Sequence, residues 1–108
     1  MFELKDVEKA VHYLGKTDES YASAKARMIA GKERLKTVLA VSYLDANGSN
    51  VKERESEALC SENYRLELEC YEEAILDFET MKNKRLRAEL TVEIWRSLNS
   101  ARTKGVMT

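Results

Sequence analysis

The feature that most constrains this chain is that its 108 residues include no proline and only four glycines. Proline breaks an α-helix more strongly than any other residue, and glycine comes next, so the helices of this chain can be very long. Charged residues make up 34% of the chain, a proportion typical of long amphipathic helices and coiled coils. β-branched residues are too few and too scattered for a sheet. The composition therefore predicts an all-α protein.

Residue spacing and turn signals predict four helices in a single helical domain over residues 1–108. Gly15 is expected to end the first helix, because glycine is common just after a helix C-terminus. Thr17 and Asp18 follow as candidate N-caps of the second helix. The predicted helices cover about residues 2–14, 18–45, 51–59 and 62–103.

The second helix is expected to end at the polar segment 45–49, because Asn47 and Gly48 tolerate a left-handed backbone. Asn50, with Glu53 three residues later, is expected to start the third helix in something close to a capping box. Ser61 is the candidate N-cap of the fourth helix. These signals make the third helix short and the fourth the longest.

The two long helices are expected to pack antiparallel as a hairpin, because the connection between them is short. The fourth helix should extend past the second by about 20 Å, with the first helix covering the extension. A long apolar seam remains thinly covered, so self-association into an oligomer is expected. The predicted seam contains Tyr21, Ala24, Met28, Gly31, Leu35 and Val38 on the second helix, and Tyr64, Leu68, Tyr71, Ile75 and Phe78 on the fourth.

The apolar face of the fourth helix widens in its second half, which is typical of a helix with more than one neighbour. Trp95, the only tryptophan, has two interpretations there: stacking on a base or anchoring a partner, and packing between the first helix and the extension. The row that Trp95 shares with Ala88 and Val92 favours packing. A second row contains Leu86, Leu90, Ile94 and Leu98.

Charge is strongly segregated along the chain, although the net charge is only −1. Residues 50–80 carry a net charge of −7, residues 81–108 of +5 and residues 20–49 of +3. Antiparallel packing brings the two basic segments together and makes one end of the hairpin basic. Three interpretations stay open: a surface for phosphate backbones, a surface for the acidic end of another subunit, and solvated helix faces with i,i+4 pairs.

No catalytic or metal-binding pattern is found. His12 is the only histidine and has no histidine or cysteine at ligand spacing, so a surface or packing role is expected. The chain has no Glu-x-x-His motif for a di-iron bundle, no glycine-rich phosphate loop and no serine or cysteine triad. Enzyme activity, a cofactor, a metal and a small-molecule substrate are therefore not expected.

The two cysteines, Cys60 and Cys70, are expected to be reduced and semi-buried, because ten residues along a helix rise about 15 Å, beyond disulfide reach. Free thiols favour a cytosolic protein. No apolar run approaches the roughly 20 residues of a membrane span, and no signal pattern is found. The sequence predicts a soluble, cytoplasmic protein that does not enter a membrane.

The order of long helix, polar turn, short helix and long C-terminal helix resembles the UvsY-type recombination mediators. Residues 36–49, Arg54, Glu55, Ala58 and the segment 88–102, with Ile94-Trp95-Arg96, look like small helical proteins of tailed phages from recombination gene clusters. The resemblance implies an oligomer in a bacterial host cell that binds single-stranded DNA or a recombination protein. It implies that the DNA-facing residues are among Lys25, Lys32, Lys82, Lys84, Arg85 and Arg87.

Two functional hypotheses follow. The first is a phage-type accessory protein of DNA recombination or replication, which acts by oligomerisation and by binding single-stranded DNA or a recombination protein. The second is a helical protein-interaction module, such as a phage regulator or inhibitor of a host protein, with no DNA binding.

Overall fold

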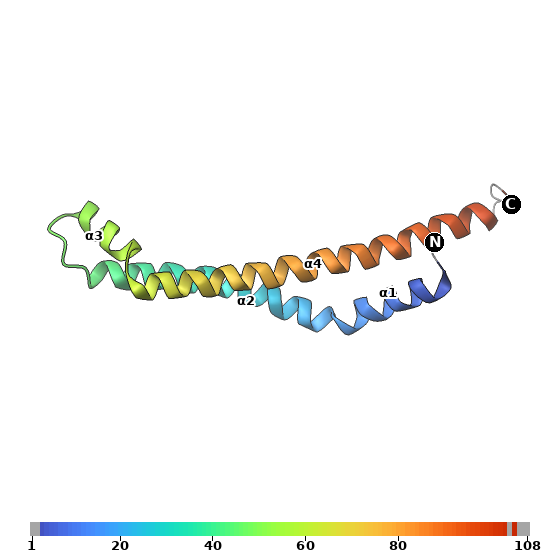
Figure 1. Ribbon diagram of the computed structural model, residues 1–108, viewed down its shortest axis with the longest axis horizontal. Coiled ribbons are helices and arrows are strands. Elements are labelled where there is room, and N and C mark those ends of the chain that lie inside the picture. Colours follow the sequence, from blue (N-terminus) through green and yellow to red (C-terminus); the bar gives the residue numbers. More distant parts are fainter. Residues whose placement is uncertain (1–2, 104, 106–108) are drawn as a thin grey trace. The chain divides into compact units, whose positions relative to one another are not determined.

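The structure, a computed structural model, describes residues 3–103 and 105, and this part of the chain contains four helices and no strand (Figure 1). The all-α class is therefore confirmed. The start predicted at residue 2 lies outside the described residues. The helices are α1 (Leu4–Lys16), α2 (Asp18–Leu44), α3 (Val51–Leu59) and α4 (Glu62–Thr103).

The chain divides into two compact units. Unit 1 comprises Met1–Ala22 and Glu79–Thr108, and unit 2 comprises Ser23–Phe78. Unit 1 thus holds α1, the first turn of α2 and the second part of α4. Unit 2 holds the rest of α2, all of α3 and the first part of α4.

In unit 2, α2 and α4 pack antiparallel as a hairpin (Figure 1). Arg27 pairs with Asp77 at 3.9 Å, and Arg34 pairs with Glu67 at 3.1 Å. The later residue on α2, Arg34, thus pairs with the earlier residue on α4, Glu67. This reversed order is the one that an antiparallel pair of helices requires. The short connection through α3 imposes this direction.

Unit 2 is closely packed because small residues of α2 and α3 occupy its most buried positions. Ala24 and Ala58 are each 1% exposed. A β-carbon placed on Gly31 would lie 3.3 Å from Cδ1 of Tyr71 and 3.9 Å from its Cα, so the two backbones approach closely there. The glycine on α2 makes room for the aromatic ring on α4.

The buried and half-buried residues follow the alternating three- and four-residue spacing of a coiled coil in two series, one on α1 and α2 and the other on α4. The first series begins on α1 and continues in the same register after the break at Thr17. In it, the inward residues, buried or half-buried, are Val7, Ala10, Leu14, Thr17, Tyr21, Ala24, Met28, Gly31, Leu35, Val38 and Ser42. In α4 they are Tyr64, Leu68, Tyr71, Ile75, Phe78, Met81, Arg85, Ala88, Val92 and Trp95.

The break between α1 and α2 is at Thr17, and the prediction that Gly15 ends the first helix is wrong. Helix α1 runs through Gly15 to Lys16. The hydroxyl of Thr17 donates to the carbonyl of Tyr13 at 2.7 Å, and its backbone N–H donates to the same carbonyl at 3.0 Å. Thr17 therefore caps α1 at its C-terminus, and its side chain does not cap α2. The carbonyl of Thr17 accepts the N–H of Tyr21 at 2.8 Å, so α2 begins without a loop.

Gly48 is needed for space, not for a left-handed backbone. Among the described residues only Gly105 has a positive φ, of 72°, so the reason predicted for the stop after α2 is wrong. A β-carbon on Gly48 would lie 2.8 Å from Cβ of Glu53 and 2.9 Å from the backbone nitrogen of Arg54. The turn folds directly against α3, and a side chain at residue 48 would collide with it.

The predicted N-caps of α3 and α4 are confirmed. The side chain of Asn50 accepts the backbone N–H of Glu53 at 2.9 Å. The carboxylate of Glu53 turns to Ser49, whose N–H and hydroxyl donate to it at 2.9 and 2.8 Å, and these two hydrogen bonds lower the pKa of Glu53. The hydroxyl of Ser61 accepts the N–H of Tyr64 at 3.2 Å at the start of α4.

The core is small, and many aliphatic side chains stay on the surface. No large side chain in the described part of the chain is fully buried, and Leu44 is 79% exposed. None of the described helices combines the length and the apolar character that crossing a bilayer demands. The other exposed large apolar residues are Leu4, Val11, Ile29, Val41, Val51, Leu59, Leu66, Leu76, Leu86, Leu90 and Ile94.

Candidate nucleic-acid interface

The six cationic residues predicted to face DNA are divided between the two units. Lys25 and Lys32 are exposed on the part of α2 in unit 2. Lys82, Lys84 and Arg87 are exposed on α4 in unit 1. Arg85, the sixth, is also in unit 1, but its side chain turns inward.

Arg85 occupies a seam position of α4, where an apolar residue would be expected, and its side chain is only 13% exposed. Its Nη1 donates to the carbonyl of Leu14 at 2.9 Å and to the hydroxyl of Thr17 at 2.7 Å. Its Nη2 pairs with Asp18 at 3.2 Å, and the guanidinium carbon lies 5.0 Å from the ring centre of Tyr21. The guanidinium thus joins α4 to the α1–α2 junction, and its donors are used within the unit.

A shallow, open depression of about 330 Å³ lies between α1 and α4 in unit 1. Two of the predicted cations, Lys84 and Arg87, line it from α4, and α1 contributes a third, Lys9. Tyr13 of α1, which is half-buried, also lines the depression. The remaining lining residues are Asp6, Ala10, Ala88 and Thr91. The structure thus brings three cations and an aromatic ring together in one place.

The cations of the depression have no ion-pair partner among the described residues. Lys9, Lys84 and Arg87 are absent from every ion pair in that part of the chain, and the same holds for Lys25, Lys32 and Lys82. In contrast, Arg27, Arg34, Arg65 and Arg96 each pair with an acidic side chain. One acidic side chain, Asp6, lines the depression, and its carboxylate accepts the N–H of Glu3 at 2.9 Å at the start of α1.

This arrangement is suited to binding a phosphate chain. Lysine and arginine side chains bind phosphates and release the counterions condensed around them, and an aromatic side chain offers a surface on which a base stacks. Unit 1 carries ten basic and eight acidic residues, a net charge of +2, whereas unit 2 carries eight basic and eleven acidic residues, a net charge of −3. The depression is therefore in the basic unit.

The sequence analysis did not identify Lys9 and Tyr13. Lys9 immediately precedes Ala10 on α1, and Lys84 and Arg87 precede Ala88 on α4 by four residues and one residue. Since α1 was expected to cover the second part of α4, the side chains beside those two small residues could have been expected to meet. Two acidic residues, Asp6 and Glu8, closely precede Lys9 in the sequence and hide this signal.

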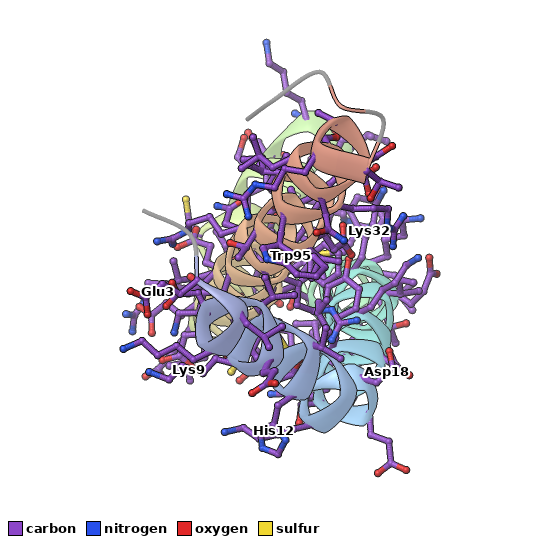
Figure 2. All side chains as sticks on the ribbon, turned by 90° about the vertical axis from the view of Figure 1, so that its right-hand side faces the viewer. Glu3, Lys9, His12, Asp18, Lys32 and Trp95 are labelled. Atoms are coloured by element: carbon purple, nitrogen blue, oxygen red, sulfur yellow. The ribbon has the colours of Figure 1, made fainter. Side chains whose placement is uncertain are left out.

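The residues predicted to form the packing seam lie on the inner side of α4. Phe78 is buried, with 7% of its surface exposed. Trp95 is half-buried on the side of α4 that faces α1 (Figure 2). It lies seven residues after Ala88 and therefore on the same side of the helix. The other predicted seam residues, Tyr64, Leu68, Tyr71 and Ile75, are half-buried in unit 2.

Unit 2 holds an apolar groove of about 530 Å³ between the C-terminal part of α2 and α3. Lys36 of α2 lies on one rim, and Glu55 of α3 lies on the other. The walls between them are almost entirely apolar, because they consist of Leu39, Ala40, Tyr43, Leu44, Ala58 and Leu59.

The remaining residues of chemical interest are isolated. His12 is exposed and points from α1 away from α4 (Figure 2). Cys60 and Cys70 are free thiols, but both are exposed, so the prediction that they are semi-buried is wrong. Cys60 is the C-cap of α3, in the turn that leads to α4. Across residues 3–103 and 105, no three histidine, cysteine, aspartate or glutamate side chains are placed to hold a metal ion.

Comparison with known proteins adds no relative to this description. No protein-family model, no curated protein and no solved structure matches the chain.

Proposed function

We propose that this chain binds single-stranded nucleic acid at the basic depression of unit 1, as an oligomeric accessory protein of DNA recombination or replication. The observation that carries the proposal is the meeting of Lys9, Lys84 and Arg87 beside Tyr13, with no acidic partner in an ion pair. The protein acts by binding and not by catalysis. The link to recombination rests on the resemblance to the UvsY-type mediators.

Single-stranded nucleic acid fits the depression better than a duplex does. The depression is short and shallow, and a flexible strand can bend into it, whereas only part of a rigid duplex would reach it. A single strand also leaves its bases free to stack on Tyr13. Because the cations contact the backbone and not the base edges, binding depends weakly on sequence.

The test is fluorescence anisotropy of a labelled 20-nucleotide single strand at low salt, with the variant Lys9→Glu/Lys84→Glu. Reversing two of the three charges is expected to weaken binding at least tenfold, while far-UV circular dichroism stays unchanged because both side chains are exposed. The matched control is Lys5→Glu/Lys52→Glu, which changes the net charge equally and leaves the depression intact. Absence of binding by the unaltered protein, or an equal loss in the control, would reject the proposal.

The second candidate function is a protein-interaction module without DNA binding, and the groove of unit 2 favours it. An apolar groove with charged rims suits an amphipathic helix better than it suits a phosphate chain. If the unaltered protein ignores the oligonucleotide but forms a stable complex with a protein through this groove, the second candidate replaces the first.

A further inference from the structure

The second part of α4 presents a row of aliphatic side chains that no element of the described structure covers. Leu86, Leu90 and Ile94 follow one another at intervals of four residues and are 46%, 58% and 41% exposed. At about 100° per residue, this row lies on the face of α4 opposite the inward residues Ala88 and Trp95. The row is therefore a ridge on the outside of unit 1.

We propose that this ridge of one copy of the chain occupies the groove between α2 and α3 in unit 2 of a second copy. Residues at intervals of four lie along one side of a helix, as do the i, i+3, i+4 and i+7 anchors with which an amphipathic helix enters an apolar groove. The proposal specifies the contact through which the oligomer of the proposed function forms, and it does not depend on nucleic-acid binding.

The charges around the two surfaces are complementary. On one flank of the ridge lies Arg87, and on the other lie Glu89 and Glu93, of which Glu93 pairs with Arg96 of its own helix at 3.4 Å. The groove has acidic Glu55 on its α3 rim and, on its α2 rim, basic Lys36, which pairs with Glu33 of its own helix at 3.3 Å. A helix can lie in a groove in two directions, and only one of them places Arg87 beside Glu55 and Glu89 beside Lys36. Charge thus selects both the partner surface and the direction of the helix.

The net charges of the units favour the same partner. The ridge belongs to unit 1, with a net charge of +2, and the groove belongs to unit 2, with a net charge of −3. Two copies therefore attract each other when unit 1 of one meets unit 2 of the other, and they repel when like units meet. Because ridge and groove are different surfaces, the contact is head-to-tail and produces a closed ring or a longer chain of subunits.

The experiment is multi-angle light scattering between about 10 and 500 µM, without oligonucleotide, on the unaltered protein and two single variants. Leu90→Gln alters the ridge only, and Leu44→Gln alters the groove only. Both side chains are more than half exposed, so the fold is expected to persist. The unaltered protein is expected to exceed the 12.4 kDa mass of one chain, and each variant to weaken association at least tenfold. The matched control is Leu66→Gln, which alters an exposed leucine of α4 outside both surfaces and should leave the mass unchanged.

Mixing the two variants provides the decisive result. Leu90→Gln keeps an intact groove and Leu44→Gln keeps an intact ridge, so the mixture is expected to form a one-to-one dimer and nothing larger. A second test reverses charge at residues outside the depression: Glu89→Lys weakens association, and adding Lys36→Glu restores it. A monomeric unaltered protein, an equal effect of Leu66→Gln, or no complex in the mixture would overturn the proposal. Nucleic-acid binding is measured separately with Lys9→Glu/Lys84→Glu, so failure of one proposal does not disguise failure of the other.

Discussion

Arg85 donates a hydrogen bond from Nη1 to the hydroxyl of Thr17 at 2.7 Å, and this contact ties the inner side of α4 to the junction of α1 and α2. The same nitrogen also donates to the carbonyl of Leu14. This carbonyl belongs to the last turn of α1, where carbonyl groups have no N–H partner within the helix. A cation at the C-terminal end of α1 is further favoured by the helix dipole. Arg85 thus supplies a hydrogen-bond donor to the C-terminal end of α1, where no loop separates α1 from α2.

Replacing Arg85 is expected to destabilise the protein. Arg85→Ala should lower the free energy of unfolding by about 2 kcal/mol, because hydrogen bonds that involve a charged group contribute roughly 1.5–3 kcal/mol. Arg85→Lys should recover only part of this loss, since an ammonium group cannot reproduce the planar fork of donors. Urea unfolding followed by circular dichroism measures both. As a control, Arg96→Ala removes an exposed ion pair and should cost less than about 0.5 kcal/mol; equal effects of the two alanine variants would contradict the role given to Arg85.

A large side chain at Gly31 is expected to separate the helices of unit 2. Gly31→Leu should lower the free energy of unfolding by about 1–3 kcal/mol, because the added atoms must displace the ring of Tyr71. Gly31→Ala should be nearly neutral: its β-carbon lies 3.3 Å from that ring, and the gain of about 1 kcal/mol in helix propensity offsets the crowding. Thermal unfolding compares them with Ala30→Leu, on the exposed side of the same turn. A gain in stability in Gly31→Leu would show that the helices do not approach closely.

Binding of single-stranded DNA at the depression is expected to weaken with salt in proportion to the number of cations. Three phosphate contacts predict that the logarithm of the binding constant falls with the logarithm of the salt concentration with a slope of about −2, at roughly −0.7 per contact. Lys84→Ala should reduce the steepness by about 0.7. Anisotropy titrations at several salt concentrations measure the slope. A slope near zero would mean that the contacts are not ionic.

The stability of α3 is expected to fall in acid. Hydrogen bonds from Ser49 lower the pKa of Glu53 in the folded protein, so its ionised form stabilises the fold above the ordinary pKa of a glutamate, about 4.3. That contribution is lost as the pH falls through the lower pKa of the folded state. Glu53→Gln should therefore be less stable than the unaltered protein at pH 7, and the difference should shrink toward pH 3. Unfolding curves at a series of pH values test this, with Glu8→Gln, an exposed glutamate of α1, as the control.

Local signals in the sequence predicted the ends of α3 and α4 well. Asn50 and Ser61 cap the N-termini of these helices through side-chain oxygens that reach only three residues along the chain. Such contacts form wherever the residues occur, so sequence alone reveals them. The prediction that Gly15 ends α1 failed because an isolated glycine can remain inside a helix at a cost of about 1 kcal/mol. The hydrogen bonds of Thr17 to Tyr13 end α1 two residues later.

The candidate site was predicted only in part. Lys84 and Arg87 are where the charge segregation suggested, on an exposed face of α4. Nothing in the charge pattern separates them from Arg85, because all three are cations within four residues. The seam register does separate them, since Arg85 stands seven residues after Phe78 and so points inward.

The sequence by itself determined the helical class, the four helices and the faces that turn inward, because these depend on the absence of proline, on capping residues and on apolar spacing within a single helix. Tertiary structure alone decided which cations are available: it engaged Arg85 at the end of α1 and brought Lys9 and Tyr13 beside Lys84 and Arg87. The physical reason is range. Helix formation is governed by neighbours a few residues apart, whereas the surroundings of a charged side chain are set by segments some seventy residues away along the chain.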